Sequence, residues 1–297
     1  HPAARGTRMV ELLAPLYALV AQVLPFECMQ VRFMQQAMVG LLLLAPMTAV
    51  MGIQVVNFRM AFFSDAISHS AFAGVALGLI FAVNPDWTMP LFGLLVGLGI
   101  MILLRHSRLS SDTVIGVFFS AMVAFGLAIV SRDRSLARDL QRFLYGDILT
   151  ISDAQILCLA ALLVALMTFQ ARSYNHLLYI GINPTLAQAH RVRVAVHQYL
   201  FAGLLALIVM FSVQAVGVLL VTALLIVPAA AARNLARSAG RMFWWALVIS
   251  VSSAVVGLLV SAQDWASTAT GATIVLVACG WFVLSMVAIT LRDRADA

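Results

Sequence analysis

The chain has 297 residues, of which 63% are hydrophobic and only 10% are charged. This apolar share is far above that of a soluble domain and predicts an all-α, polytopic membrane protein with nearly the whole chain in the bilayer. The net charge of +6 comes from arginine alone, because the sequence contains no lysine. Since a Walker A loop uses a lysine to hold phosphate, a P-loop ATPase is excluded. In a membrane protein such a charge excess indicates cytoplasmic loops rather than a nucleic-acid partner.

The first apolar stretch covers Val10–Leu24. Residues 1–8 precede Met9 and are set aside as a remnant or ragged start, which leaves 9–294 as one transmembrane domain. The stretch follows two arginines as a signal peptide would, but no small-residue cleavage site comes after it. We therefore expect a first helix here that either spans the membrane or lies at its interface.

Further apolar segments recur along the rest of the chain, several of them near the roughly 20 residues that span a bilayer. They lie at 34–56, 62–83, 89–104, 112–131, 153–171, 198–213, 216–232, 242–262 and 270–291. The short segments 198–213 and 216–232 could form one broken passage, so we expect eight to ten transmembrane helices. Unopposed arginines recur in alternate loops, which by the positive-inside rule favours ten passages with both termini in the cytoplasm.

An acidic and a histidine residue lie one turn apart in the segment 62–83. Asp65 and His69 would share a helix face, about 6 Å apart along the axis, with Ser68 on the same side. A carboxylate and an imidazole can ligate zinc, manganese or iron, and ionisable groups at membrane depth usually mark an ion or proton path. The alternative is a hydrogen-bonded pair that only fixes packing, but the cost of a carboxylate in hydrocarbon favours the ion path.

Small residues recur every fourth position beside this pair. The series Ala66, Ser70, Gly74, Gly78 predicts that another helix comes very close to this face. Ser68, Ser70 and Gly74 are therefore candidate pathway or packing residues.

A short helix is predicted in the loop 172–197. Asn183 before Pro184 is a helix-start signal, and Leu186, Ala189 and His190 would share one face of the helix that follows. Such a helix across a loop suits docking into the groove of a partner. An interfacial helix that only anchors to lipid fits equally well.

Pro228 interrupts the apolar run Gly217–Arg233. A proline inside a helix frees a backbone carbonyl one turn earlier and tends to kink the helix. Broken helices at membrane depth often line a pathway. A kink with a purely structural role is equally consistent with these residues.

Three blocks of the sequence resemble the ABC-3 family of bacterial importer permeases, which serve zinc, manganese and chelated iron. Ser64-Asp-Ala-Ile-Ser-His-Ser70 is similar to the family's Gly-Asp-Ala-Leu-Ser-His-Ala block, with serine in place of the glycine. Leu144-Tyr-Gly-Asp-Ile-Leu149 is similar to its Phe-Gly-Asp-Ile-Leu element, and Gly217–Arg233 to its signature around Pro-Ala-Ala. The blocks agree in order and spacing, so the resemblance covers residues 34–290.

The resemblance implies a homodimer in the bacterial inner membrane, with two cytoplasmic ATPase subunits and an extracytoplasmic metal-binding protein. Asp65 and His69 match the positions expected to meet the metal in transit. The coupling helix, which contacts the ATPase, falls on Asn183, Pro184, Leu186, His190 and Arg191. We expect the charged loop 132–147 to face outward and dock the donor protein through Arg134, Arg138, Arg142 and Asp147. Its exposed ion pairs contribute little to stability, so their density suggests a docking role.

The cargo expected from this resemblance is zinc, with manganese or iron next, and we expect no permanently bound cofactor. A proton-coupled secondary transporter would also place Asp and His in the membrane, but it would normally show an internal repeat, and none is evident. An intramembrane enzyme would need a His-Glu-x-x-His or Gly-x-Ser-x-Gly motif, and the sequence has neither. We therefore expect a permease whose ATP hydrolysis takes place on a separate subunit, with membrane lipid as its solvent.

Overall fold

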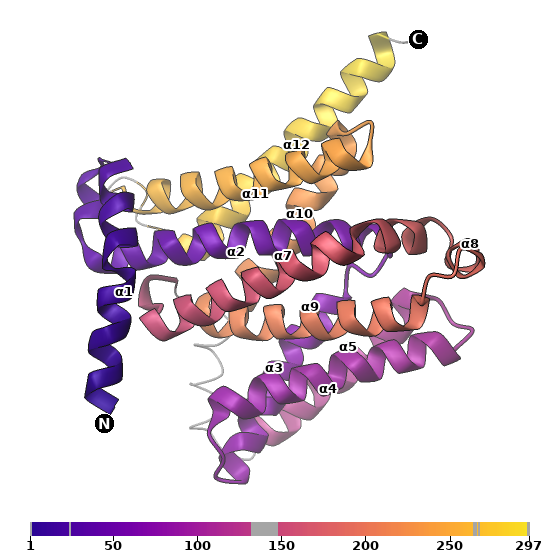
Figure 1. Ribbon diagram of the computed structural model, residues 1–297, viewed down its shortest axis with the longest axis horizontal. Helices are drawn as coiled ribbons and strands as arrows, with labels where there is room; N and C mark the ends of the chain where they lie inside the picture. Colours follow the sequence, from indigo (N-terminus) through magenta and orange to yellow (C-terminus); the bar gives the residue numbers. More distant parts are fainter. Residues whose placement is uncertain (1, 24, 132–147, 264–265, 267, 296–297) are drawn as a thin grey trace.

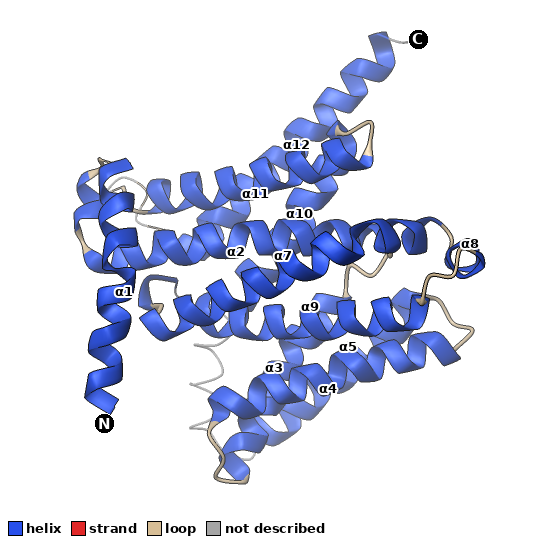
Figure 2. Cartoon of the chain, in the orientation of Figure 1, coloured by secondary structure: helices blue, strands red, loops and turns tan. Residues whose placement is uncertain are grey.

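The computed structural model describes residues 2–23, 25–131, 148–263, 266 and 268–295, and every regular element among them is a helix (Figures 1 and 2). The first half contains α1 (Pro2–Val23), η1 (Glu27–Gln30), α2 (Arg32–Asn57), α3 (Phe63–Ile80), α4 (Pro85–His106) and α5 (Ser111–Val130). The second half contains η2 (Ile148–Thr150), α7 (Asp153–Ile182), α8 (Pro184–Ala189), α9 (Val194–Val216), α10 (Val218–Leu235), α11 (Ala239–Ser261) and α12 (Thr270–Ala295).

Eight helices in the described part of the chain are long and apolar enough to cross a membrane: α2, α4, α5, α7, α9, α10, α11 and α12. In hydrocarbon every backbone polar group must pair internally, and a helix satisfies this requirement within one segment. The all-α, multi-pass architecture predicted from composition is therefore confirmed. The shorter helix α3, which contains Asp65 and His69, is not among the eight.

Local sequence signals set the helix boundaries. Asn84 caps α4 by accepting a hydrogen bond from the Asp86 amide at 2.9 Å, with Pro85 at the first helical position. Ser152 and Gln155 form a reciprocal capping box at the start of α7. Gly217, with φ 85°, separates α9 from α10. The segments 198–213 and 216–232 thus belong to two separate helices rather than to one broken passage.

α2 is the central helix of the bundle (Figure 1). It packs against α7, α10 and α11, and 78% of its apolar window is buried, compared with 17% for α5 and α12. α3, α4, α5 and α9 form a neighbouring group, in which α3 packs closely against α4 and α5. The peripheral helices leave apolar side chains exposed, as expected where lipid is the solvent.

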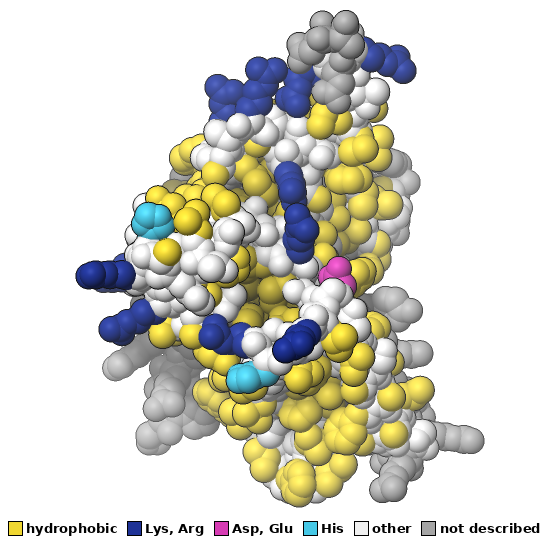
Figure 3. All heavy atoms as spheres, turned by 90° about the vertical axis from the view of Figure 1, so that its right-hand side faces the viewer, with side chains coloured by type: hydrophobic (Ala, Val, Ile, Leu, Met, Phe, Trp, Pro, Cys, Tyr) yellow, Lys and Arg dark blue, Asp and Glu magenta, His cyan; other side chains and the backbone are white. Residues whose placement is uncertain are grey.

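The long helices present two distinct ends. The starts of α4 and α7 and the end of α9 meet at one end, where Gln214 contacts the backbone of Asp86 and Gln155 contacts that of Gln214, both at 3.3 Å. We name this the Asp153 end, after the first residue of α7. The turn with Arg59, the last turns of α4 and α10 with Arg105 and Arg233, and Arg193 before α9 lie at the opposite end, named the arginine end. Arginine side chains spread across it (Figure 3).

α1 runs across the Asp153 end, nearly perpendicular to α2 (Figure 1). Asp153 ties it to the bundle by accepting hydrogen bonds from Tyr17 at 2.5 Å and Gln36 at 2.8 Å, and by pairing with Arg32 at 3.0 Å. No other ion pair occurs in the part of the chain that the structure describes. Burial, followed by the hydrogen bond to Asp153, raises the pKa of the Tyr17 phenol. The structure therefore shows a helix at the start of the chain that lies across one end of the bundle, and its placement at the membrane interface stays a prediction.

Candidate metal pathway

Asp65 and His69 lie on α3, which begins directly after a sharp turn. Arg59 adopts a left-handed conformation with φ 55°, and the Phe63 amide donates a hydrogen bond to the Met60 carbonyl at 3.0 Å. Asp65 then falls in the first helical turn, where the helix dipole favours a carboxylate. His69 follows one turn later and shares a face with Asp65.

Both side chains are half-buried, and neither has a hydrogen bond or ion pair with any residue that the structure describes. The His69 ring meets Phe119 of α5 edge to face, with ring centroids 5.0 Å apart, and Phe72 at 5.7 Å. Aromatic contacts thus position the imidazole without using its nitrogens. A carboxylate and an imidazole without protein partners can both bind a cation.

The small-residue face of α3 packs against α4, as the sequence predicts. A Cβ atom added at Gly74 would lie 2.9 Å from the Met89 Cα, and one at Gly78 would lie 2.4 Å from the Thr88 hydroxyl oxygen. Ser70 is buried and donates a hydrogen bond to the Ile67 carbonyl at 2.6 Å. Ser68 is also fully buried, but its hydroxyl has no partner among the described residues.

The number of metal ligands in one chain limits the kind of metal site that it can form. Among the described residues there is no group of three or more His, Cys, Asp or Glu that could hold a metal ion. Asp65 and His69 supply two ligands, whereas a closed zinc site takes four. Such a pair fits a station that a cation passes through, because transport requires release as well as binding.

Pro228 lies inside α10 at the contact with α2. A Cβ atom added at Gly52 of α2 would lie 1.9 Å from the Leu225 carbonyl oxygen and 3.3 Å from the Ala229 Cβ. Pro228 itself is buried. The surroundings of this proline are therefore those of close helix packing, and a role in the pathway stays a prediction.

α8 occupies the position of the short helix predicted at 183–193. The Asn183 side chain caps it by accepting from the amides of Thr185 at 2.9 Å and Leu186 at 3.2 Å, and Pro184 is its first residue. Ala187 anchors the helix by packing against Ile180 and Val194. Leu186 remains 50% exposed.

The residues that close α8 are also exposed. His190 ends the helix with its ring facing Tyr179, the centroids 6.2 Å apart, and Arg191 follows in a left-handed conformation with φ 61°. Leu186, His190 and Arg191 thus form an accessible surface at the arginine end. The predicted donor-docking residues lie outside the described residues: Arg134, Arg138, Arg142 and Asp147.

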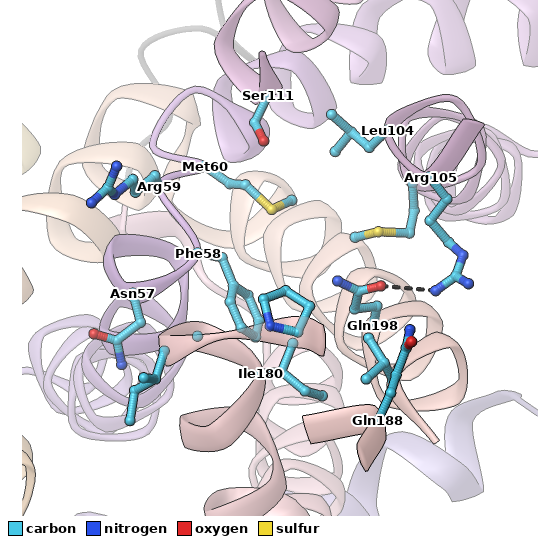
Figure 4. Close-up of a pocket in the computed structure, with 15 residues that line it drawn as sticks. Asn57, Phe58, Arg59, Met60, Leu104, Arg105, Ser111, Ile180, Gln188 and Gln198 are labelled. Atoms are coloured by element: carbon cyan, nitrogen blue, oxygen red, sulfur yellow. Dashed lines mark hydrogen bonds between the residues drawn. The ribbon is translucent and has the colours of Figure 1, made fainter. Parts of the chain in front are cut away.

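A cavity of about 590 Å³ opens at the arginine end, behind α8 (Figure 4). Arg105 donates a hydrogen bond to Gln198 at 2.9 Å on one side, and Arg59 lies across the cavity from this pair. An adjoining cavity of about 330 Å³ shares Arg59 and includes Arg233. None of the described residues that line these two cavities is acidic. The sequence had indicated these arginines only as markers of topology, because they are far apart along the chain.

The fold and the two unpartnered side chains on α3 are those of a polytopic membrane transporter. The sequence profile of the ABC 3 transport family matches residues 30–289, so the chain belongs to this family. The resemblance found in the sequence is thereby confirmed.

Relatives and a solved structure agree with this assignment. The high-affinity zinc uptake system membrane protein ZnuB of Haemophilus influenzae is 32% identical over 82% of this chain and 93% of its own length. The manganese transport system membrane protein MntC of Listeria monocytogenes is 31% identical over 84% of this chain and 88% of its own. The structure of PsaBC from Streptococcus pneumoniae in complex with a Fab matches with a TM-score of 0.74 at 28% identity, covering 92% and 95% of the two chains.

Proposed function

We propose that this chain is the membrane permease subunit of an ATP-binding-cassette importer that carries a divalent transition metal into the cytoplasm. The observation that supports this most is the pair Asp65 and His69 in a chain of the ABC 3 transport family. Both are half-buried on α3 and have no hydrogen bond or ion pair with a residue that the structure describes. A divalent cation cannot cross bare hydrocarbon, so the path must supply oxygen or nitrogen ligands.

Zinc is the cargo we propose first, with manganese or iron next. ZnuB and MntC have nearly equal identity to this chain, and their names give zinc and manganese. One imidazole and one carboxylate do not separate these ions, since zinc favours imidazole and manganese tolerates carboxylate and water. The donor protein is therefore proposed to select the metal.

The working assembly contains two copies of the chain, two cytoplasmic ATPase subunits and an extracytoplasmic donor. A two-fold axis would bring Asp65 and His69 of both copies toward one path, giving four ligands from two chains. α8 supplies an exposed surface for the ATPase, and the sequence without lysine has no Walker A loop of its own.

We place the arginine end in the cytoplasm of a bacterial inner membrane, following the positive-inside rule. The last turn of α12 has Arg292 and Arg294, which supports a cytoplasmic C-terminus. α1 lies at the other end of the bundle, so this proposal differs from the expectation of two cytoplasmic termini. α3 leads from the Arg59 turn at the arginine end to the start of α4 at the Asp153 end, so the proposal counts it as a crossing in addition to the eight longer helices.

The test of this function is zinc uptake into vesicles that hold the permease, its ATPase and its donor. Zinc uptake should require ATP on the side of the membrane with the ATPase and the donor protein on the opposite side. A proton gradient without ATP should drive no zinc uptake. The control is the same vesicle with an ATPase that binds but does not hydrolyse ATP. Uptake driven by a proton gradient in the absence of ATP would favour the secondary transporter instead.

A further inference from the structure

An apolar groove of about 400 Å³ runs along the outside of the bundle between α7 and the start of α11. Its two walls come from one helix each, and the residues that line it are Met167, Gln170, Ala171, Tyr174, Gly240, Phe243 and Trp244. The rings of Tyr174 and Phe243 meet edge to face across the groove, with centroids 6.3 Å apart. It is separate from the cavities behind α8, because it shares no residue with them.

One polar side chain in this groove has no partner. Gln170 is only 6% exposed, and neither its amide nitrogen nor its amide oxygen has a hydrogen bond among the described residues. A buried amide without partners costs free energy that a bound polar group would recover. The groove therefore suits a ligand that is mostly apolar and has a polar group at the level of Gln170.

A positively charged side chain, that of Arg241, lies beside the groove. Arg241 lines an adjoining pocket of about 430 Å³ together with Trp244, Trp245 and Val248, and Trp244 belongs to both pockets. Arg241 has no ion pair with any described residue. The exposed rings of Trp244 and Trp245 are typical of the membrane interface, where one part of the ring is apolar and the other wet.

The length of α7 gives the depth of these residues. Its 30 residues extend about 45 Å, more than the roughly 30 Å of bilayer hydrocarbon. Gln170 lies about 26 Å from the start of the helix, and the exposed Arg172 follows two residues later. Gln170 is thus near the boundary between hydrocarbon and headgroups on the side of the arginine end.

We propose that this groove binds an anionic phospholipid. Its acyl chain lies along Met167 and Phe243, its glycerol ester meets the Gln170 amide, and its phosphate pairs with Arg241. The order of the groove residues, from apolar through amide to cation, follows the order of groups in a phospholipid. On the arginine end this lipid belongs to the cytoplasmic leaflet, whose negative charge arginine attracts.

Brominated lipids test the site, since bromine quenches a tryptophan that it contacts. The full-length protein is placed in phosphatidylcholine vesicles containing brominated phosphatidylglycerol or, in a second series, brominated phosphatidylcholine. Phosphatidylglycerol should quench more strongly. Arg241→Gln should reduce this preference about fivefold, the loss expected for one arginine near an anionic surface. Arg237→Gln removes the same charge from an exposed residue that lines neither pocket, so it should leave the preference unchanged.

Gln170→Leu separates lipid binding from folding. The leucine removes an unpaired buried amide, so the thermal stability in detergent without lipid should be equal or higher. The added stability that phosphatidylglycerol confers on the wild-type protein should be lost. These readouts do not involve transport, so they remain decisive whether or not the proposed function holds.

Three results would overturn the proposal. Equal quenching by the two lipids would show that the groove does not select an anionic headgroup. Equal effects of Arg241→Gln and Arg237→Gln would show that the phosphate does not meet Arg241. A disulfide between two copies carrying Gly240→Cys, in a background whose native cysteines are replaced by serine, would show that a second copy covers the groove.

Discussion

At the scale of single residues, some polar side chains have hydrogen-bond or ion-pair partners, and a few have none among the described residues. Asp153 receives three partners at the end of the bundle, whereas Asp65 and His69 in α3 receive none among the described residues. A carboxylate kept in an apolar helix without a partner destabilises the fold. A role in binding a passing cation accounts for both its position and its lack of partners.

Asp65→Asn and His69→Ala should each reduce zinc uptake by at least about tenfold, because loss of even an indirect metal partner costs 10–100-fold. The double change should cost little more than either single change, since the two residues act as one site. The measurement is initial zinc uptake in vesicles with ATPase and donor. Protein yield, dimer assembly and ATPase binding serve as controls and should remain unchanged. Near-normal uptake in the double variant would leave these residues with a packing role only.

At the scale of helices, Gly52 marks a close approach between α2 and α10. Gly52 faces the backbone of α10, and no side chain fits between the two helices at this point. The contact explains why Pro228 is tolerated, because neighbouring helices hold a proline-containing segment in place. It also makes Gly52 a sensitive position for folding.

Gly52→Ala should destabilise the protein by about 1–3 kcal/mol, since the added methyl would overlap the Leu225 carbonyl oxygen and force the helices apart. Thermal unfolding in detergent, followed by size-exclusion chromatography, measures the change. Gly116→Ala on α5 is the matched control, because nothing lies within 4 Å of its added Cβ atom. Equal stability of the two variants would contradict the close contact.

Leu186→Asp together with His190→Asp should dissociate or uncouple the ATPase subunit from α8. Both residues are exposed, so the fold should tolerate the change while an apolar contact with the partner would not. Co-purification of the ATPase and zinc-stimulated ATP hydrolysis are the measurements. Thr185→Asp adds an acid at the favourable start of the same helix and serves as the control. If both measurements survived the double change, α8 would not be the coupling surface.

At the scale of the whole molecule, charge separates the two ends of the bundle. The arginine end has cavities lined by Arg59, Arg105 and Arg233, and α1 covers part of the opposite end. A cation that leaves past unpaired arginines would not be held there, since like charges repel. The described residues of the arginine end therefore offer no site that would retain a metal ion.

Cysteine labelling tests the proposed orientation. In a background without native cysteines, Arg193→Cys at the arginine end should react with a membrane-impermeant maleimide only from the cytoplasmic side. Trp87→Cys, near the start of α4, should react only from the outside, because Trp87 is 72% exposed near the Asp153 end. Reaction of both from one side would contradict the end-to-end arrangement of the bundle.

Much of the fold follows from the sequence alone. A chain with so few charges must satisfy its backbone within helices, and Asn-Pro and Ser-x-x-Gln signals mark where those helices begin. The spacing of Asp65 and His69 places them on one helix face without any knowledge of neighbours. The series of small residues from Ala66 to Gly78 predicted that another helix packs closely against α3, but it did not identify α4 as that helix.

Other features depend on which helices become neighbours, and no local pattern contains that information. α1 turns across the bundle because Asp153, far along the chain, accepts the Tyr17 hydrogen bond. Arg59, Arg105 and Arg233 line adjoining cavities only because the turn after α2 places Arg59 in both the cavity at the end of α4 and the cavity at the end of α10. Gln170 has no hydrogen-bond partner among the described residues, and aromatic rings of α11 line the same groove, so its amide became a candidate site only in three dimensions. Sequence determined the helices and the pairing of a carboxylate with an imidazole on one face of α3, whereas tertiary packing decided which polar groups of the described residues find partners.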